Sequence, residues 1–469
     1  MLIRICRLSS LPDCRILLNG DVMKQLLLFA ALTCLITPAL AAVSPEQAAR
    51  LGKDLTPVGA EKAGNGRDIP AWTGGLAKDN RHAPGSFHKD PYAREKPLFR
   101  IDATNMEQHR DRLTEGQMAL LKRFPDFYLE VYPTHRSASY PDYVYDGIRV
   151  NATRAELMKY GSGVSGATMS SPFPVPQNGL EVLWNHTLRF RAHSLSYTSV
   201  ASSVTEDGQR MDALRKYEYF FQYSIPGAKP EELDNKIFFL KRKTLSPARL
   251  AGTITLVHET LDQVRSPRKS WIYVPGQRRL RRTPDLEYDT ADINTNSIRT
   301  VDQVDMFNGA PDYYDWELQG KREIYIPYNA YRAHQGNLKL DDILQQHHLN
   351  PALLRYEAHR VWVIEARLRV GYSHRYATRR YYVDEDSWSI VYAEEYDAHN
   401  KLWQVTEAHT INYYEVPLIY TTLEVTYDLL SGRYYVEGLD NERDSTLNFS
   451  MDLNADDFSP NAVRREAVR

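Results

Sequence analysis

Apolar and polar residues alternate along most of the chain after residue 180. In the clearest run, 361–370, every second position is apolar, and Glu365, Arg367 and Arg369 stand between them. Successive side chains of a strand point to opposite faces, so this run predicts a strand with one buried and one solvated face, as antiparallel sheets allow. The apolar positions are Trp362, Ile364, Ala366, Leu368 and Val370.

Similar alternation predicts a succession of further strands. They are expected at 186–199, 214–223, 236–242, 250–260, 270–274, 322–326, 376–383, 388–396, 401–414, 421–428 and 433–437. Ser431-Gly432 separates the last two, which indicates a hairpin. So many strands with few helices predict a β-dominated α+β fold, whose large curved antiparallel sheet forms a half-barrel or open barrel around a few helices.

The residues before 180 lack this alternation and predict an arm with a few helices. Ser44-Pro45-Glu46-Gln47 favours a short helix. Residues 53–100 are rich in Gly, Pro, Asp and Lys and predict an extended N-terminal arm that lies over the rest of the protein. Capping-box spacing at Thr114–Gln117 and at Thr153–Glu156 predicts two more helices.

Two connecting segments complete the outline. Gly161 is expected to end the second of these helices, and the Gly, Ser and Pro residues from 161 to 179 predict a linker. A local helix is expected near 341–348.

From Met23 the chain has the pattern of a secretory signal. One Lys precedes an apolar run from Leu26 to Ile36, and small residues lead to a cleavage site after Ala41. The apolar run is about half of the ~20 residues that span a bilayer, which disfavours a transmembrane anchor. Residues 1–22 do not resemble a leader, so we expect translation to begin at Met23 and the mature protein to reside in the periplasm.

These features divide the chain into five parts. They are an N-terminal extension at 1–22, a signal peptide at 23–41, an arm with helices at 42–179, the half-barrel at 180–440 and a polar tail at 441–469.

Composition excludes several functional classes. Cleavage after Ala41 would remove Cys6, Cys14 and Cys34, so no disulfide, thiolate metal site or cysteine nucleophile is expected. Lys and Arg number 58 against 60 Asp and Glu, and this balance disfavours a nucleic-acid partner. The 31 Tyr residues suit strands and surfaces that are apolar along the ring and wet at the hydroxyl.

No motif predicts catalysis, a cofactor or a metal. His258-Glu259 lies in a strand-like run, where neighbours face opposite sides and cannot share an ion. We expect His347-His348 to be a solvated pair and Asp384-Glu385-Asp386 to be a solvated hairpin turn rather than a cation site. Arg278–Arg282 predicts a strand edge guarded by charge against aggregation, and contact with an anionic lipid head group or with a partner is the alternative.

Aromatic and aliphatic stripes on the predicted strands are the strongest binding signal. Core packing and a ligand cavity explain them equally well, and the concave face of a curved sheet is a common place for an apolar pocket. The candidate ligand-contacting residues are Trp271, Tyr273, Trp362, Ile364, Leu368, Trp388, Ile390 and Tyr392.

Several motifs resemble known families. Lys269–Gly276, followed by the arginine-rich run, resembles a strand pair of LolA/LolB-like lipoprotein-sorting proteins, and Tyr381–Asp397 resembles their acidic hairpin. Three longer segments, Leu51–Gly75, Phe307–Tyr328 and Val361–Trp403, resemble the domain-of-unknown-function family DUF1329.

The resemblance implies a half-barrel around helices that encloses an apolar cavity, in the periplasm and without enzymatic activity. Members tend to be encoded beside a resistance-nodulation-division transporter and an outer-membrane barrel-like protein, which implies a role in moving a hydrophobic molecule. The long region before the sheet is absent from small lipoprotein carriers and speaks against a lipoprotein cargo. The resemblance supplies no binding residues.

We therefore hypothesise a non-enzymatic periplasmic carrier or chaperone that holds a lipid or other hydrophobic molecule in the concave face. It would serve transport to or through the outer membrane, with an inner-membrane efflux-type transporter and an outer-membrane protein as partners. The alternative is an adaptor that couples these two without carrying a ligand. A periplasmic lipid hydrolase is a third hypothesis, which needs a nucleophile and a base to converge in three dimensions.

Overall fold

The computed structural model describes residues 43–283 and 288–468. The expected N-terminal extension, the signal peptide and the three cysteines lie outside these residues, so they stay predictions. Within the described ranges, no helix is long and apolar enough to cross a membrane.

Fifteen strands of the described residues form one large, open, curved sheet, as the sequence predicts. Its order is β1-β2-β12-β13-β14-β15-β16-β17-β5-β6-β7-β8-β9-β10, with β11 paired to β12. The pairings are antiparallel except where β2 meets β12 at Val131 and Tyr356. The bounds are β1 Phe99–Ile101, β2 Leu129–Val131, β5 Ser194–Val204, β6 Arg210–Phe220, β7 Lys236–Ser246, β8 Ile254–Thr260, β9 Lys269–Val274, β10 Arg279–Arg282, β11 Tyr314–Pro327, β12 Tyr356–Leu368, β13 Thr378–Asp384, β14 Ile390–Tyr396, β15 Leu402–Asn412, β16 Ile419–Asp428 and β17 Tyr434–Leu439; β3 Glu156–Leu157 and β4 Val164–Ser165 pair separately.

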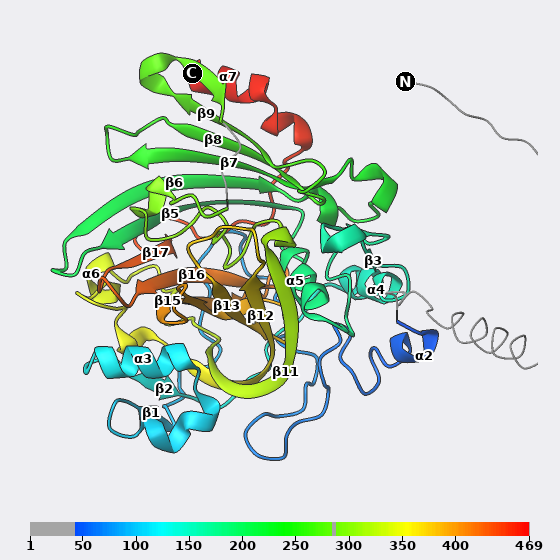
Figure 1. Ribbon diagram of the computed structural model, residues 1–469, viewed down its shortest axis with the longest axis vertical. Helices are drawn as coiled ribbons and strands as arrows, with labels where there is room; N and C mark the ends of the chain where they lie inside the picture. Colours follow the sequence, from blue (N-terminus) through cyan, green and yellow to red (C-terminus); the bar gives the residue numbers. More distant parts are fainter. Residues whose placement is uncertain (1–42, 284–287, 469) are drawn as a thin grey trace, which may run out of the picture. The chain divides into compact units, whose positions relative to one another are not determined.

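Two meanders build this sheet. Strands β5 to β10 follow one another as hairpins, as do β12 to β17, and the two sets join where β17 pairs with β5 (Figure 1). Residues of β6 and β7 share one hydrophobic core with residues of β12 and β13, although these strands lie far apart in the strand order. The face that they share is therefore the concave face, and we call this core the concave core.

Strand β12 is buried on both faces for most of its length as far as Ala366, and its last residues, Arg367 and Leu368, reach solvent, so the prediction of one solvated face is wrong for most of the strand. Ile364 lies in the concave core, whereas Val363 lies in a second core on the convex face. Glu365 is nearly buried as well, and its carboxylate lies 2.9 Å from the Arg380 guanidinium. Hydrophobic alternation could not distinguish this strand from a half-solvated one, because ion-paired residues occupy some of its buried positions.

The helices differ from the prediction between residues 150 and 190. The capping box at Thr114 is present. At Thr153 no helix begins, because α4 ends at Asn151 and Glu156 starts β3. The expected linker is packed instead, and α5, buried along most of its length, occupies the start of the strand expected at 186–199. The α-helices of the described residues are α2 Pro45–Ala48, α3 Glu115–Arg123, α4 Asp142–Asn151, α5 Gly179–Thr187, α6 Leu340–Ile343 and α7 Pro460–Val468.

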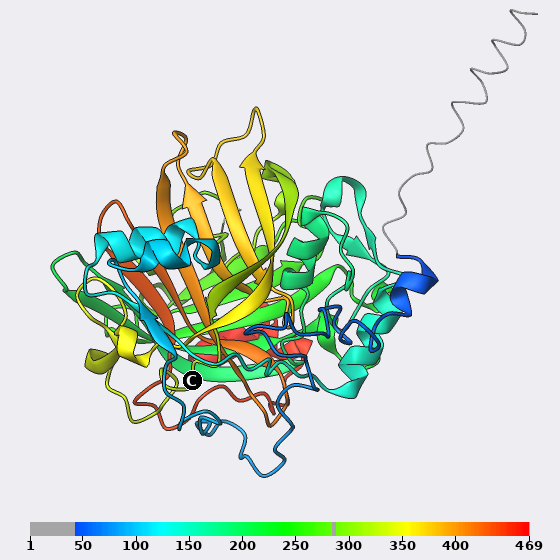
Figure 2. The ribbon, with the colours of Figure 1, turned by 90° about the horizontal axis from the view of Figure 1, so that it is seen from below.

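Helices cover both faces of the sheet. Val144 of α4 and Trp184 of α5 belong to the concave core. On the convex face, Leu120 of α3 packs with strands β12 to β17 and with Ile69 of the arm, and Figure 2 shows the cyan helix lying against the orange strands. The extended N-terminal arm is thus confirmed, while the proposed domain limits stay predictions.

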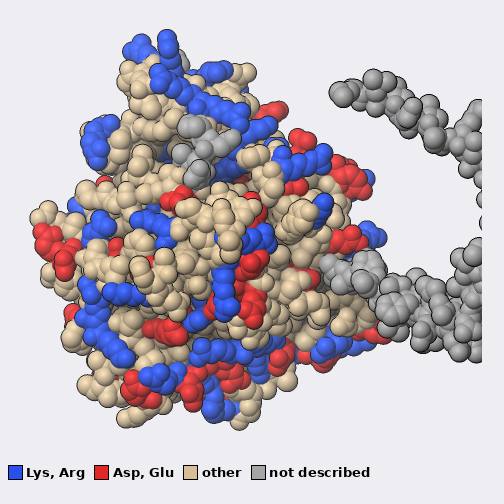
Figure 3. Space-filling model, in the orientation of Figure 1, with Lys and Arg blue, Asp and Glu red and all other residues tan. Residues whose placement is uncertain are grey.

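The edge strand β10 carries the arginine run, as expected for a guarded edge. It pairs with β9 and stands last in the strand order. Arg279, Arg281 and Arg282 are exposed. Figure 3 shows Lys and Arg side chains gathered over the end of the protein that carries β7, β8, β9 and α7.

A third core fixes the C-terminal segment to the outside of β6 to β9, and it provides a test of the fold. Phe458 is fully buried there between Phe220 and Phe239. We expect Phe458→Ala to lower the free energy of unfolding by about 3–5 kcal/mol, because it removes a buried ring and leaves a cavity. Ile293→Ala, at a side chain that is 83% exposed, should change it by less than about 0.5 kcal/mol in the same urea titration. Equal effects of the two variants would contradict the packing of this segment.

Candidate functional site

Five of the eight candidate side chains lie together in the concave core. Trp362 stacks on Trp388, with 6.3 Å between ring centroids. The space in front of these strands is occupied by side chains of the helices, among them Val182 and Trp184 of α5. The five are Trp362, Ile364, Leu368, Trp388 and Ile390, and in this structure they pack against protein.

Tyr392 lies on the opposite face, in the convex core. A β-bulge in β14 explains this separation. The neighbours Val383 and Tyr382 of β13 pair with Ile390 and Tyr392, so Val391 is an extra residue in β14. The extra residue reverses the alternation that the sequence suggests. Helix α3 covers the tyrosine, and a Cβ on Gly116 would come within 2.8 Å of its hydroxyl.

Trp271 and Tyr273 also lie outside the concave core. Both belong to the third core, beneath the C-terminal segment, where the Trp271 ring lies 4.7 Å from that of His258. The Nε2–H group of His258 donates a hydrogen bond to the carbonyl oxygen of Phe458 at 2.8 Å, whereas Glu259 pairs with Arg268. The neighbours His258 and Glu259 therefore do face opposite sides, as predicted.

A cleft of about 680 Å³ lies elsewhere, between the arm and one end of the sheet. We call it the arm cleft. Its walls come from the arm, β1, the end of β2 and strands β11 and β12, and none of the eight candidates lines it. Leu98 and Phe99 are 61% and 37% exposed at its margin, and the Phe99 ring stacks on His109. The lining residues are 64, 66–71, 98–99, 131–134, 325 and 358.

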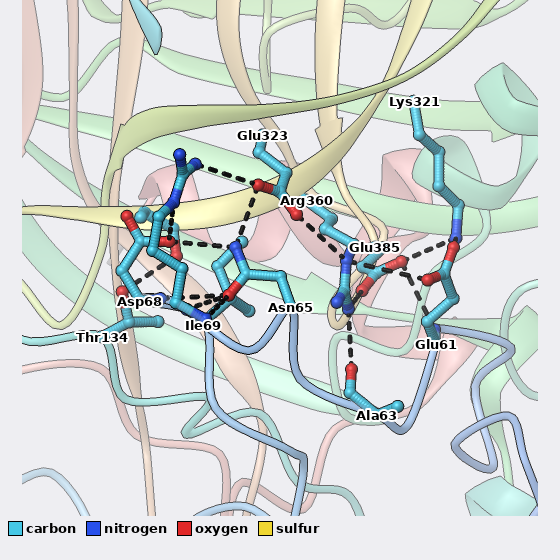
Figure 4. Close-up of polar contacts among 12 residues, drawn as sticks. Glu61, Ala63, Asn65, Asp68, Ile69, Thr134, Lys321, Glu323, Arg360 and Glu385 are labelled. Atoms are coloured by element: carbon cyan, nitrogen blue, oxygen red, sulfur yellow. Dashed lines mark hydrogen bonds and ion pairs between the residues drawn. The ribbon is translucent and has the colours of Figure 1, made fainter.

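A tight turn of the arm forms one wall of this cleft. The side-chain oxygen of Asn65 accepts hydrogen bonds from the backbone N–H groups of Arg67, Asp68 and Ile69. Its amide nitrogen donates to Glu323 of β11 at 2.9 Å (Figure 4). Gly64 is required here, because a Cβ would lie 2.5 Å from the Ile69 carbonyl oxygen.

A buried ion-pair network holds the same part of the arm against the sheet. Glu385, in the β13–β14 hairpin, lies 2.7 Å from Lys321, 3.3 Å from Arg360 and 3.4 Å from Arg136. Lys321 also reaches Glu61 of the arm at 3.0 Å, as Figure 4 shows. The arm, β11, β12 and the hairpin are thus joined through one carboxylate.

The hairpin Asp384-Glu385-Asp386 is therefore not a solvated turn. All three residues are at most 2% exposed. Asp386 accepts two hydrogen bonds from Arg136, at 2.7 and 2.8 Å. Burial and the neighbouring charge of Asp386 raise the pKa of Asp384 to about 7. Cations that come from distant segments make this burial possible, and a single sequence does not reveal them.

Two groups of side chains in the described ranges have donors close enough to share a metal ion. One is His359, Asp384 and Asp386, in which Arg136 already engages Asp386. The other is His82, His88 and Glu415, in which the two histidine rings stack at 4.2 Å and His88 contacts Glu415 at 2.7 Å.

The expected solvated histidine pair near residue 348 is also wrong for His348. Its ring is buried beside Phe124 and Phe127, and one ring nitrogen lies 3.2 Å from Asp126.

Comparison with known families agrees with the motifs in the sequence. The sequence profile of DUF1329, a protein of unknown function, matches residues 100–464. The chain belongs to the DUF1329 family. The resemblance noted in the sequence is confirmed.

Similar proteins are found among both sequences and solved structures. This DUF1329 protein is 44% identical over 442 residues to the uncharacterized protein PA3922 of Pseudomonas aeruginosa, which covers 94% of this chain and 97% of the relative. A DUF1329 family protein from Desulfovibrio piger is 15% identical, with a TM-score of 0.40 over 58% of this chain and 92% of that one. A putative outer membrane lipoprotein-sorting protein domain from Vibrio parahaemolyticus is 14% identical, with a TM-score of 0.41 over 61% and 98%.

The three segments noted for their resemblance converge on the arm cleft and its ion pairs. Phe307–Tyr328, which supplies β11, and Val361–Trp403, which supplies the acidic hairpin, lie within the residues that match DUF1329, whereas Leu51–Gly75, which supplies the arm, precedes them. Hydrophobic periodicity could not predict the cleft, because the arm has little regular secondary structure and therefore shows no period. The length of the first motif, in a segment without regular structure, was the available signal.

The network makes a prediction about stability. Arg136→Leu leaves Asp386 buried without its guanidinium, so we expect the free energy of unfolding to fall by about 3–5 kcal/mol. Arg149→Leu, which breaks the exposed pair with Asp146, should lower it by no more than about 1 kcal/mol. Denaturant titrations of both variants measure the difference, and limited proteolysis near residues 61–71 should speed up only in the first. A similar loss in both would show that the buried pair does not hold the arm.

A buried carboxyl elsewhere predicts a pH dependence. Burial raises the pKa of Asp440 to about 7, although Thr446 donates a hydrogen bond to it. The folded protein keeps this proton up to about pH 7, whereas the unfolded chain releases it near pH 4, so stability falls as the pH rises through that window. Asp440→Asn should remove this loss, and its advantage over the wild type should grow by at most about 4 kcal/mol between pH 4 and pH 8. Parallel pH profiles of the two proteins would refute the assignment.

Proposed function

We propose that this DUF1329 protein is a non-enzymatic periplasmic carrier or chaperone of a lipid or other hydrophobic molecule, which it binds in the arm cleft. The observation that carries the proposal is the size and lining of the cleft. Its volume of about 680 Å³ lies in the range of small-molecule sites, about 300–1,000 Å³. The periplasmic location is inferred from the secretory pattern at residues 23–41.

The margin of the cleft favours an apolar ligand. Leu98 and Phe99 present exposed apolar surface, and covering it with an acyl chain or a ring system contributes roughly 25 cal/mol per Å² buried. The charged lining residues Arg67 and Asp68 are engaged by protein, since they form ion pairs with Glu323 and Arg112. This arrangement supports binding rather than chemistry.

The concave face is a weaker candidate for the ligand. Five of the predicted residues lie there, but helices α4 and α5 fill the space in front of them. A ligand would need these helices to move apart and would have to displace buried side chains such as Trp184.

The same filled interior favours the alternative function, an adaptor that couples an inner-membrane transporter to an outer-membrane protein. Native mass spectrometry of protein purified from periplasm, followed by solvent extraction, distinguishes the two. A stoichiometric hydrophobic compound supports the carrier. An empty protein that still captures a transporter supports the adaptor.

Variants locate the site. Leu98→Asp places a charge at the margin of the arm cleft without removing a buried side chain, and it should weaken ligand retention by about tenfold, since one leucine-sized apolar contact is worth about 1.5 kcal/mol. Val370→Asp, fully exposed beyond the other end of β12, is the matched control and should retain the ligand. If Leu98→Asp retains the ligand and Leu368→Arg loses it, the concave face is the site instead.

A further inference from the structure

Strands β7 to β10 and the turns between them carry a strong excess of positive charge. Residues 236–282, which we call the basic wing, contain twelve Lys or Arg and two Asp or Glu, in a chain with a formal net charge of −2. Figure 3 shows this excess as a blue region over the end of the protein that carries β7 to β9. A guarded strand edge accounts for charge on β10 alone. It does not account for charge on the other strands and turns.

Five of these twelve cations have interactions within the fold, among them Lys236, which lies 3.8 Å from Asp234. Lys241 and Lys243 pair with Glu466 of α7, and Arg268 pairs with Glu259. Seven others have side chains without an ion pair or hydrogen bond to any residue in the described ranges. They are Arg242, Arg249, Arg265, Lys269, Arg278, Arg279 and Arg281.

The register of the last two strands places arginines on an uncovered face. Arg279 pairs with Val274 and Arg281 with Ile272, so both arginines point to the same side. Leu280, between them, points to the other side and packs in the third core beneath α7. The face away from α7 therefore presents two guanidinium groups beside half-buried aliphatic side chains.

One end of the wing adds exposed apolar residues to these cations. The turns at 247–253 and 275–278 lie together, since a Cβ on Gly252 would be 2.9 Å from the Pro275 ring. Leu245, just before the first turn, and Leu250, within it, are each 39% exposed, and Arg249 lies in the same turn. Aliphatic side chains flanked by arginines match the lipid–water boundary, where the former enter the acyl region and the latter bind phosphate.

We propose that the basic wing docks on a membrane surface rich in anionic phospholipid head groups, with the turns at 247–253 and 275–278 in contact with the bilayer. A membrane fits better than an acidic protein, because the exposed apolar side chains at the turns are the aliphatic Leu245 and Leu250, rather than the Tyr and Trp typical of protein interfaces. The wing and the arm cleft use different strands, so docking does not require a ligand in the cleft.

Vesicle co-sedimentation tests this proposal. The mature protein should bind vesicles of phosphatidylcholine with 30% phosphatidylglycerol at low salt, and it should bind pure phosphatidylcholine vesicles far less. Raising the salt should weaken binding, because exposed charges are screened. Arg279→Glu/Arg281→Glu should lower the affinity by about 25-fold or more, since each cation near an anionic surface contributes about fivefold.

Matched variants separate docking from other causes. Arg94→Glu/Lys96→Glu makes the same charge change at exposed arm positions that have no ion pair within the described residues, and this variant should bind vesicles like the wild type. If the β10 variant fails to fold, Arg249→Glu/Arg278→Glu tests the same surface at its turns. Leu250→Asp should weaken binding even at high salt, because it removes the apolar contact.

Three outcomes would overturn the proposal: equal binding to neutral and anionic vesicles, no binding to either, or equal loss in the arm control. Capture of an acidic protein that depends on Arg279 and Arg281, without vesicle binding, would replace the membrane by a protein partner. The Leu98→Asp variant, altered at the arm cleft, should bind anionic vesicles like the wild type. A loss of vesicle binding is therefore distinguishable from a loss of ligand binding.

Discussion

The burial of three successive carboxylates in the β13–β14 hairpin is the constraint on which the rest of the structure depends. Buried carboxylates are tolerated only where cations and hydrogen bonds compensate for lost hydration. Here the compensating groups come from three separate segments, Arg136 before α4, Lys321 on β11 and Arg360 on β12. These segments must therefore converge on the hairpin. Glu61 of the arm pairs with Lys321, so the arm is held against the hairpin as well. The arm cannot leave the sheet without exposing this network.

This convergence explains where the protein leaves room for a ligand. The arm reaches the sheet through polar contacts at the hairpin and through the Asn65 turn, rather than through a continuous apolar stripe. Between these contacts and strands β1 and β2 an apolar gap remains, which is the arm cleft. The concave face has no comparable free volume, because side chains of α4 and α5, which come before β5 in the chain, pack into it. The free volume that we expected inside the half-barrel thus lies beneath the arm.

Local pattern was sufficient for the sheet and insufficient for the site. Alternation of apolar and polar residues predicted most strands from β5 onward, because the two-residue period of a strand is recognisable within a few residues. It failed at Tyr392, where one bulged residue reverses the faces, and at α5, whose buried residues have no polar face to mark a helix. It also failed at Asp384–Asp386, since the partners that bury an acidic turn lie far away in sequence. Candidate residues chosen by alternation therefore fell into three different cores.

The small net charge of the chain hides an uneven distribution of charge between its parts. The chain is close to neutral as a whole, yet residues 236–282 are strongly basic, so the remainder is acidic. Much of that acidic excess is paired inside the fold, around Arg136 and Arg360, whereas most of the basic excess is left at the surface.

The cleft uses β1, β2, β11 and β12, at one end of the strand order, and the basic wing uses β7 to β10, at the other. An open sheet keeps both ends available, which a closed barrel would not. The proposed carrier would therefore hold its ligand at one end of the sheet and meet a membrane at the other, and the two surfaces use different strands.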